Sequence, residues 1–331
     1  MTPARGLTAA TWPAALAVSG LLGACGLLGA CGRDRRGDAA GSSAAAGGAS
    51  GTDAGGDARA VAGADAAGPG GPGGDGTSAG EVGAPTHSFH PDLGAAFARV
   101  LRDRPRVLGV GELHVRTDRP AATSALARFT AEVMPALGPT VSDLVIETWL
   151  VDPACRIAGA ATQRVEAAMK RPESTKDEIG GLVGVIKQNG IKAHVMRLSC
   201  DDLAQVAPAD GVDAEKLLDV VTRELGRVTR SAVRYRDERA EVRPLIVVYG
   251  GALHNDLYPF KSTAQWSYAA AVDEASGGRF VEVDLYLPEL IEGQALYEQE
   301  PWYPLVAATP AGQVLLVERA PHSWLAVLPR S

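Results

Sequence analysis

The chain has 331 residues, of which 46% are hydrophobic, and a formal net charge of −7. The length is enough for one large domain with a full core, together with segments that do not fold. The acidic balance and the lack of a basic stripe argue against a nucleic-acid-binding protein. Beyond the N-terminal region, no apolar run is long enough to span a bilayer.

The N-terminus has the pattern of an export signal. Arg5 is followed by the apolar, small-residue run AALAVSGLLGACGLLGAC, which is typical of a signal peptide. The segment LLGAC occurs twice and ends at Cys25 and at Cys31, and Leu-Gly-Ala-Cys resembles the bacterial lipobox, whose cysteine becomes the lipidated first residue. Cys25 is favoured because it leaves an apolar run closer to the usual ~7–15 residues. The alternatives are lipidation at Cys31, an uncleaved anchor, or an ordinary signal peptide cut at an alanine.

A composition change then separates a linker from a folded domain. Residues 33–86 contain no Leu, Ile, Met or aromatic residue, so they cannot bury enough apolar surface to offset the entropy of ordering. We therefore expect a lipoprotein signal peptide over 1–31, a disordered tether over 32–86 and one domain over 87–331. Neither candidate cysteine is followed by Asp, which favours a lipid anchor in the outer membrane, with the domain in the periplasm or at the cell surface.

Hydrophobic periodicity predicts alternating helices and strands in the domain. Continuous apolar strands separated by helices indicate a mainly parallel sheet with helices on both faces, an α/β fold. The strand at 279–287 alternates apolar and polar residues, as expected toward a sheet edge, and the chain ends in an antiparallel hairpin that turns near Pro321. The predicted helices are 92–103, 119–137, 174–188 and 213–240, and the other predicted strands are 106–110, 143–147, 193–199 and 245–250.

Polar residues capable of chemistry follow the principal strands. Ligands of an open parallel sheet bind beyond the carboxyl ends of its strands, so these residues are expected to share one site. Glycines in the same motifs, GVGELH and YGGALH, would let backbone or ligand approach closely. The expected site residues are Glu112, His114, Glu147, Asp201, Asp202 and His254.

Three common sites are excluded by their motifs. GVGELH begins like a dinucleotide fingerprint, but His114 stands where Gly or Ala is needed. The chain also lacks the Gly-x-Ser-x-Gly nucleophile elbow and the His-Glu-x-x-His metal-binding helix.

The segments VLGVGELH, DLVIETW and VVYGGALH together resemble the haem-binding-uptake/TIKI superfamily, which includes ChaN-like lipoproteins, TraB/TIKI proteins and, more distantly, erythromycin esterases. The resemblance covers roughly residues 105–260. It matches Glu112 with His114, Glu147, and Gly251 with His254 to the motifs of the superfamily. It implies an α/β fold with the site at the strand ends, and a function among metal-dependent peptidases, esterases and haem binders. The tyrosine haem ligand of ChaN-like proteins has no counterpart here that can be aligned.

Two imidazoles and two carboxylates suit a divalent transition metal such as Zn, Mn or Fe. We therefore expect a metal-dependent hydrolase acting on a small molecule or a peptide, with His114 and His254 as ligands. Glu112 or Glu147 would be the third ligand or the catalytic base. A metal-free variant would use one histidine as general base, held by Glu147.

Two alternatives to a hydrolase stay open. One is a haem- or iron-binding lipoprotein without turnover, for which Tyr297, Trp302 and Tyr303 could contact a flat ligand. Those aromatics could equally pack on the hairpin. The other alternative is a degenerate family member that serves as a structural or interaction domain.

Cys155 and Cys200 are the two cysteines of the domain. Export would expose them to an oxidising compartment, so they could form a disulfide, and the alternative is two separately buried thiols. A catalytic Cys200 is disfavoured because the neighbouring carboxylates in RLSCDD oppose a thiolate.

Overall fold

The computed structural model describes residues 85–331 except 120–121, 153 and 240–242. The predicted signal peptide, both lipobox cysteines and nearly all of the predicted tether lie outside the described residues. No helix in the described ranges has the length and apolar character needed to cross a membrane.

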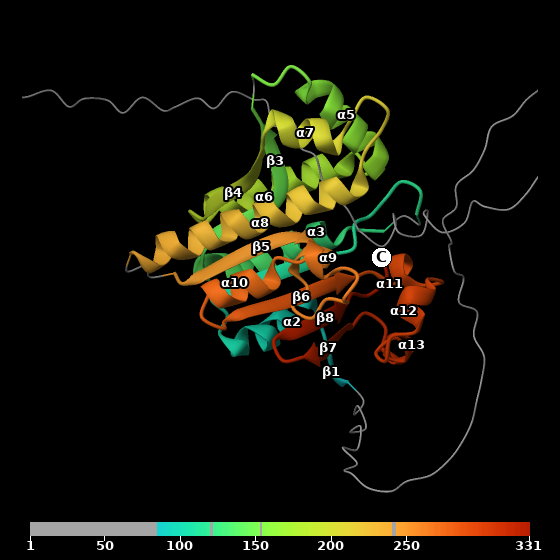
Figure 1. Cartoon of the computed structure of the whole chain (residues 1–331). Helices are drawn as coiled ribbons and strands as arrows, with labels where there is room; N and C mark the ends of the chain where they lie inside the picture. The colour runs from blue at the N-terminus through green and yellow to red at the C-terminus, as the bar shows by residue number, and fades with distance from the viewer. Residues whose placement is uncertain (1–84, 120–121, 153, 240–242) are drawn as a thin grey trace, which may run out of the picture. The chain divides into compact units, whose positions relative to one another are not determined.

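The domain is built on one eight-stranded sheet with the order β1-β7-β8-β6-β2-β5-β3-β4 (Figure 1). The strands from β8 to β4 in this order run parallel to one another, whereas β7 runs antiparallel to both β8 and β1. The strands are β1 (Thr86–His90), β2 (Val107–Glu112), β3 (Val141–Val151), β4 (Lys192–Leu198), β5 (Leu245–Gly251), β6 (Phe280–Tyr286), β7 (Val314–Ala320) and β8 (Ser323–Val327).

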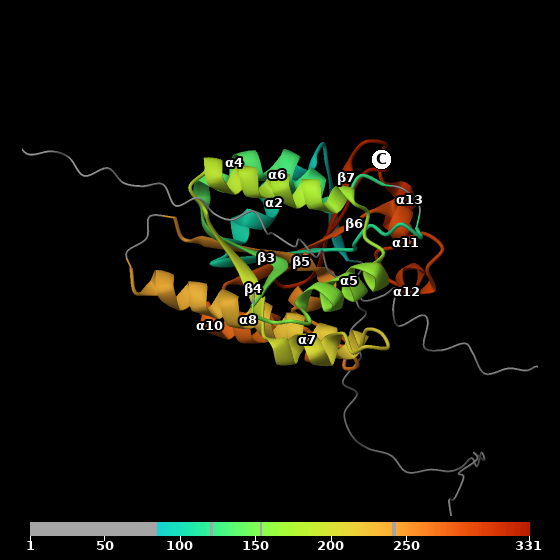
Figure 2. The same cartoon turned by 90° about the horizontal axis from the view of Figure 1, so that it is seen from above.

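Helices cover both faces of the sheet (Figure 2). One face carries α2 (Leu93–Val100), α3 (Ala125–Arg128), α4 (Met134–Leu137) and α6 (Ser174–Gln188). The other carries α5 (Ala158–Met169), α7 (Cys200–Val206), α8 (Ala214–Asp237) and α10 (Ala269–Ala275). The remaining short helices are α9 (Ala252–Asn255), α11 (Pro288–Ile291), α12 (Ala295–Glu298) and α13 (Pro304–Ala308), and single turns lie at Leu101–Asp103, Phe129–Val133, Gly138–Thr140 and Ala264–Trp266.

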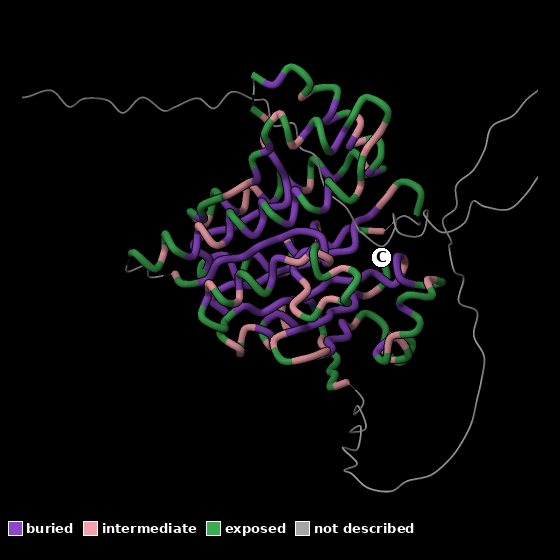
Figure 3. Tube along the Cα trace, in the orientation of Figure 1, coloured by how far each residue is buried: buried purple, intermediate pink, exposed green. Residues whose placement is uncertain are grey.

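The core consists of two apolar layers, one on each side of the sheet. Central strands β2, β5 and β6 are buried along their whole length (Figure 3), and in β2 and β5 the sequence is accordingly almost continuously apolar. Helix α8 shows how the outer elements form. Asp213 caps its first turn by accepting from Lys216 N, and its buried stripe includes Leu217, Val221 and Leu225.

The α/β class, the mainly parallel sheet and the C-terminal hairpin are confirmed. The helix predicted at 119–137 is shorter, because Ser124 caps α3 by accepting from Ala127 N. Several elements were not predicted: strand β1, helices α5, α7 and α10, and the short helices α9, α11, α12 and α13. Strand β1 is short and exposed, so it carries little periodic signal, and it begins at Thr86, inside the range predicted as tether.

The expectation that residues 279–287 lie toward a sheet edge is wrong. Strand β6 lies inside the sheet between β8 and β2. Its alternating polar residues Glu282 and Asp284 are fully buried, and Arg319 of β7 makes ion pairs with both. The polar face of this strand therefore meets a buried cation instead of water.

Candidate functional site

The structure brings together four of the predicted residues, at the carboxyl ends of β2 and β5 and in the second half of β3, which continues to Val151 instead of ending at Glu147 as predicted. Glu112 is the last residue of β2, and His114 follows it in the next segment. Glu147 lies in β3, level with Gly250 of the neighbouring strand, since Ile146 pairs with Tyr249. His254 lies in α9, directly after β5. All four side chains are buried, with His254 only 1% exposed.

Glu112 and His114 form a tightly bonded pair. The Glu112 Oε1 atom lies 2.7 Å from His114 Nδ1, and its Oε2 atom accepts a 2.7 Å hydrogen bond from the Tyr249 hydroxyl. The guanidinium of Arg171 lies 3.9 Å from the same carboxylate. Burial acts to raise the pKa of Glu112, but the interaction with His114, helped by the charge of Arg171 and the hydrogen bond from Tyr249, outweighs burial and lowers that pKa. Glu112 is therefore ionised and accepts a hydrogen bond from the protonated Nδ1 atom of His114. The Nε2 atom of His114 then carries a lone pair instead of a proton.

His254 has the same tautomer for a different reason. The Thr222 hydroxyl donates to the carbonyl oxygen of Trp266 at 2.9 Å, so it accepts from His254 Nδ1 at 2.8 Å. The Trp266 carbonyl lies 3.1 Å from the same nitrogen. The proton is thus on Nδ1 and the lone pair on Nε2. Burial lowers the pKa of His254 to about 4, and burial with the positive charge of Arg171 lowers that of His114 to about 4, so both rings are neutral at pH 7.

Glu147 is the carboxyl group whose ionisation the site opposes. Its Oε2 atom accepts a hydrogen bond from Gly251 N, and its Oε1 atom lies 3.9 Å from His254 Nε2. Burial raises the pKa of Glu147 to about 8, and the charge of Glu112 acts in the same direction. Glu147 is therefore mainly protonated at neutral pH, in contrast to Glu112.

Three buried polar atoms in this site have no hydrogen-bond partner. They are His114 Nε2, His254 Nε2 and Glu147 Oε1. Buried polar atoms are normally satisfied, so three orphans in one site indicate a missing ligand or water. Among the described residues, no group of three or more His, Cys, Asp or Glu side chains is already spaced to hold a metal ion.

Glycines make this close packing feasible. A Cβ on Gly111 would lie 2.6 Å from Ala252 Cα of α9, and one on Gly250 would lie 2.3 Å from Glu147 Oε2. The missing side chains therefore let the turn that carries His254 lie against β2 and let Glu147 lie over β5.

Three contributors to the site were not predicted: Arg171, Tyr249 and Thr222. Tyr249 had a weak signal, because its hydroxyl is the polar group in an otherwise apolar strand. Thr222 shares the stripe of α8 with core residues, and Arg171 follows α5 with no motif around it. Only the fold brings Arg171 close to Glu112 and Glu147.

Asp201 and Asp202, also expected at the site, act at the start of α7. Asp202 forms a capping box with Ser199 and an ion pair with Arg223 at 2.9 Å. Asp201 is exposed in the same first turn. Carboxylates in that position stabilise the helix N-terminus, so their role at this strand end is structural.

Cys155 and Cys200 are free thiols that lie side by side. The hydrogen bond with Cys155, together with burial and nearby carboxylates, raises the pKa of Cys200 to about 11. Such a thiol is a poor nucleophile at neutral pH, in line with the argument against a catalytic cysteine.

The aromatic residues considered for haem binding pack on one another. The Tyr297 and Trp302 rings lie 5.4 and 5.9 Å from the ring of Tyr286 in β6, and both residues are about 95% buried. They contribute to the core beside the hairpin, and only Tyr303 is partly exposed.

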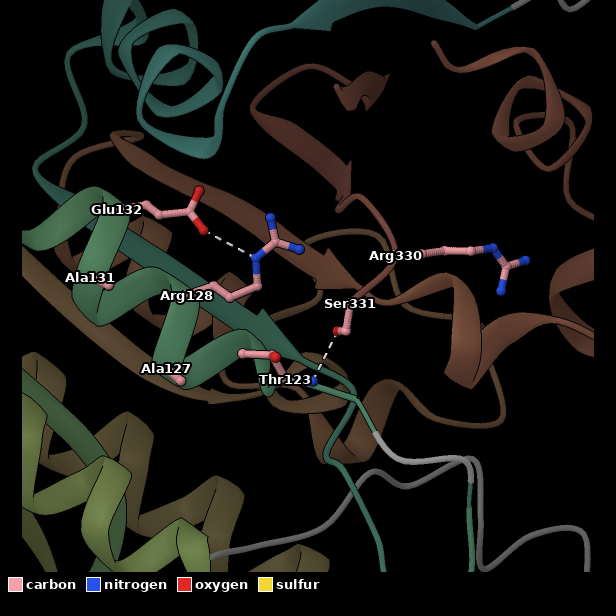
Figure 4. A pocket seen from close by; sticks show the side chains of 7 residues that line it. All are labelled: Thr123, Ala127, Arg128, Ala131, Glu132, Arg330 and Ser331. Carbon is pink, nitrogen blue, oxygen red and sulfur yellow. Dashed lines mark hydrogen bonds and ion pairs between the residues drawn. The ribbon is translucent and has the colours of Figure 1, made fainter. Parts of the chain in front are cut away.

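A surface pocket of about 390 Å³ lies elsewhere, between α3 and the end of the chain (Figure 4). Its charged groups already have partners: Arg128 pairs with Glu132, and Arg330 pairs with Glu292. None of the strand-end residues lines it. The pocket is lined by Thr123, Ala127, Arg128, Ala131, Glu132, Arg330 and Ser331.

Comparison of the chain with protein-family models, with curated proteins and with solved structures gives no match.

Proposed function

We propose that the strand-end residues form the active site of a hydrolase, most simply a metal-dependent one of the ChaN/TIKI type. The observation that carries the proposal is the set of three buried, unpartnered atoms on His114, His254 and Glu147. In both histidines the Nδ1 proton is hydrogen-bonded to an acceptor within the protein. The lone pair on Nε2 is therefore free to bind a ligand. Metal-binding histidines are oriented in this way by an outer carboxylate or carbonyl.

The donor set fits a divalent transition metal. His114 Nε2, His254 Nε2 and Glu147 Oε1 would hold the ion, with a position open for water. The 3.9 Å between Glu147 Oε1 and His254 Nε2 is longer than the roughly 3.3 Å between two ligands of a tetrahedral ion, so these side chains would have to move closer together on binding. Bound there, zinc, manganese or iron would supply a Lewis acid and a water of lowered pKa.

This assignment changes the expected role of Glu112. Its two oxygens are taken by His114, Tyr249 and Arg171, so it orients and polarises His114 instead of binding the ion. Glu147 takes its place as the third ligand. Its raised pKa comes from burial, and a bound cation would lower that pKa and favour the ionised carboxylate.

A metal-free mechanism is the second candidate, favoured by the cation already present in Arg171. The Glu112–His114 pair has the form of a general-base dyad, in which Glu112 fixes the tautomer and His114 Nε2 accepts a proton from a nucleophilic water. Glu147, protonated at neutral pH, can donate a proton to a leaving group. Arg171 would stabilise negative charge that develops nearby.

Haem binding without turnover draws less support, because Tyr297 and Trp302 are buried in the core. A purely structural role, the third alternative, would require buried water to satisfy the three unpartnered atoms.

The test compares metal binding and stability in the same variants. His114→Ala and His254→Ala should each lower affinity for Zn²⁺ or Co²⁺ by at least tenfold and leave the fold intact. His87→Ala, in exposed strand β1, is the matched control and should bind as the wild type does. Wild-type protein that binds no divalent metal, yet loses hydrolytic activity in His114→Ala, would favour the metal-free mechanism. Unchanged binding and activity in both site variants would refute a functional site.

A further inference from the structure

A second cluster of buried charges lies beside the turn that carries His254. Glu282 and Asp284 of β6 are 0% and 1% exposed. Arg319 Nη2 donates to Glu282 Oε1 and to Asp284 Oδ2, at 2.8 Å in each case. One guanidinium therefore faces two buried carboxyl groups. The other titratable groups that act on them, Asp256 and Tyr268, supply no positive charge.

The hydrogen bonds of Glu282 are those of an ionised carboxylate. Its Oε1 atom accepts from Arg319 and from the Ser323 hydroxyl, and its Oε2 atom accepts from Leu257 N. Both oxygens thus face donors. The positive charge of Arg319 therefore neutralises ionised Glu282, and no second positive charge is present to neutralise Asp284.

Asp284 has different surroundings, because its Oδ1 atom faces the side-chain amide of Asn255. The Asn255 amide can have two orientations. In the first, its nitrogen faces Asp284 and makes one long hydrogen bond of 3.3 Å. In the second, the amide is rotated by half a turn and its nitrogen donates to the carbonyls of Ala252 and Gly251 at 3.0 and 3.2 Å. The second orientation satisfies the nitrogen twice, and it places the amide oxygen of Asn255 against Asp284 Oδ1. Two acceptors make a stable contact only when one of them carries a proton.

We infer that Asp284 carries a proton on Oδ1 and donates it to the amide oxygen of Asn255, and that Asp284 is thereby a positioning residue for the turn that bears His254. A proton there makes the group of Glu282, Asp284 and Arg319 neutral overall, as burial requires. Burial raises the pKa of both carboxyl groups, of Asp284 to about 6 and of Glu282 to about 8, and Arg319 only partly offsets this effect. The hydrogen bonds decide which group carries the proton: both oxygens of Glu282 accept from donors, whereas Asp284 Oδ1 faces the amide oxygen of Asn255. Two residues after Asn255, the backbone N–H of Leu257 donates to Glu282, so the chain on this side of the turn is also bonded to the cluster. The role of His254 rests on the proposed function, whereas the proton on Asp284 does not.

Two isosteric variants of the full chain distinguish this arrangement from an ordinary ion pair. Asp284→Asn places an amide nitrogen where the proton donor is needed and an oxygen where Arg319 donates, so its denaturation midpoint at pH 6 should stay near that of the wild type. Glu282→Gln removes the negative charge that pairs with Arg319 and places an amide nitrogen against the donors that Glu282 accepts from. The denaturation midpoint of this variant should therefore be clearly lower than that of the wild type. Equal losses in the two variants would overturn the inference.

The proton itself can be observed by infrared spectroscopy of protein labelled with ¹³C in its aspartate carboxyl groups. At pH 6 the wild type should show a protonated-carboxyl band, because exposed aspartates are ionised at that pH. The labelling excludes Glu147 and Glu282 from the signal. The band should be lost in Asp284→Asn. A band that persists in that variant, or its absence from the wild type, would overturn the assignment, and neither outcome requires Glu282→Gln to fold.

The positioning role has its own readout. The His254 Nδ1 proton is buried and bonded to Thr222 and the Trp266 carbonyl, so it should give a slowly exchanging NMR signal. Asp284→Ala should shift or broaden this signal, and Asp284→Asn should preserve it. An unchanged signal in a folded Asp284→Ala protein would refute the positioning role. Because this readout needs no metal and no substrate, it is decided even if the proposed hydrolase function fails.

Discussion

Glu147 couples the charge state of the site to the stability of the fold. Its pKa of about 8 in the folded chain is above the ordinary value of 4.5. The folded state therefore binds this proton more tightly than the unfolded state does. The resulting stabilisation is complete below pH 4.5, decreases as the pH rises, and is lost above about pH 8.

Glu147→Gln should remove that pH dependence. Relative to the variant, the wild type should lose about 3–5 kcal/mol of unfolding free energy between pH 4.5 and pH 8.5. Denaturant unfolding over this range measures the difference. Glu274→Gln, at an exposed position in α10, is the control and should parallel the wild type. If Glu147→Gln and the wild type changed in parallel, Glu147 would not be the buried acid described above.

The two histidines act in the opposite direction. Their folded pKa values of about 4 are below the ordinary 6.5, so their contribution is present above pH 6.5 and is lost as the pH falls toward 4. Together with Glu147, they should make the combined contribution of the three groups to stability greatest near pH 6.5. Added Zn²⁺ should shift this optimum upward, because an ion bound to Glu147 favours the ionised carboxylate. Thermal unfolding scans at several pH values, with and without Zn²⁺, check this prediction, and a shift that was also present in His254→Ala would contradict it.

At the scale of elements, the packing of α9 against β2 depends on Gly111. A Cβ there would lie 2.3 Å from Asp284 Oδ1 and 2.6 Å from Ala252 Cα, and the latter is backbone that cannot rotate away. Gly111→Ala should therefore destabilise the domain by about 1–3 kcal/mol. Gly181→Ala in α6 is the matched control, because no atom lies within 4 Å of its added Cβ. That change should stabilise the helix by about 0.5–1 kcal/mol. Similar effects of both changes on urea unfolding would contradict the close packing.

The thiols of Cys155 and Cys200 connect the segment after β3 to the start of α7. Because they already lie side by side, we predict that they form a disulfide when the protein is prepared from an oxidising compartment. Thiol titration of the unfolded, unreduced domain, residues 87–331, measures this. Cys200→Ser, which should leave one free thiol where the wild type leaves none in the domain, is the control. Two free thiols in the oxidised wild type would refute the bridge.

The sequence predicted most elements because their apolar residues repeat with the period of the structure that forms. Strand β6 shows where this reasoning fails. Glu282 and Asp284 alternate with apolar residues as solvent-facing residues do, and only Arg319, 35 or more positions away, makes their burial tolerable. Local patterns contain no information on such a distant partner.

In the candidate site, too, local sequence patterns predict some residues and miss those that only the fold brings together. Glu112, His114, Glu147 and His254 could be predicted because each lies at or shortly after the end of an apolar run in the sequence, and parallel strands bring such residues to one edge. Asp201 and Asp202 satisfied the same rule but serve as helix caps, because Ser199 and Arg223 are in reach of Asp202. Arg171 satisfied no local rule, since the fold alone places it near Glu112.

For the whole molecule, we propose export and attachment to a membrane by a lipid, with the site held on a tether. The proposal rests on the duplicated LLGAC segment and on the composition of residues 33–86. A Gly-rich coil of this length would span about 40 Å root-mean-square, enough to keep the domain clear of the lipid surface.

Two single substitutions identify the lipidated residue. If Cys25 is modified, Cys25→Ser should abolish acylation and release the protein from the membrane fraction, whereas Cys31→Ser should leave both unchanged, since the chain is cut before Cys25. If Cys31 is modified, the two results exchange. Mass spectrometry of the mature N-terminus should show a diacyl or triacyl cysteine at one of the two positions. Cys200→Ser, within the domain, controls for general effects of losing a thiol. An unmodified N-terminus, or a membrane-bound protein after both cysteines are replaced, would show that the chain is attached in another way.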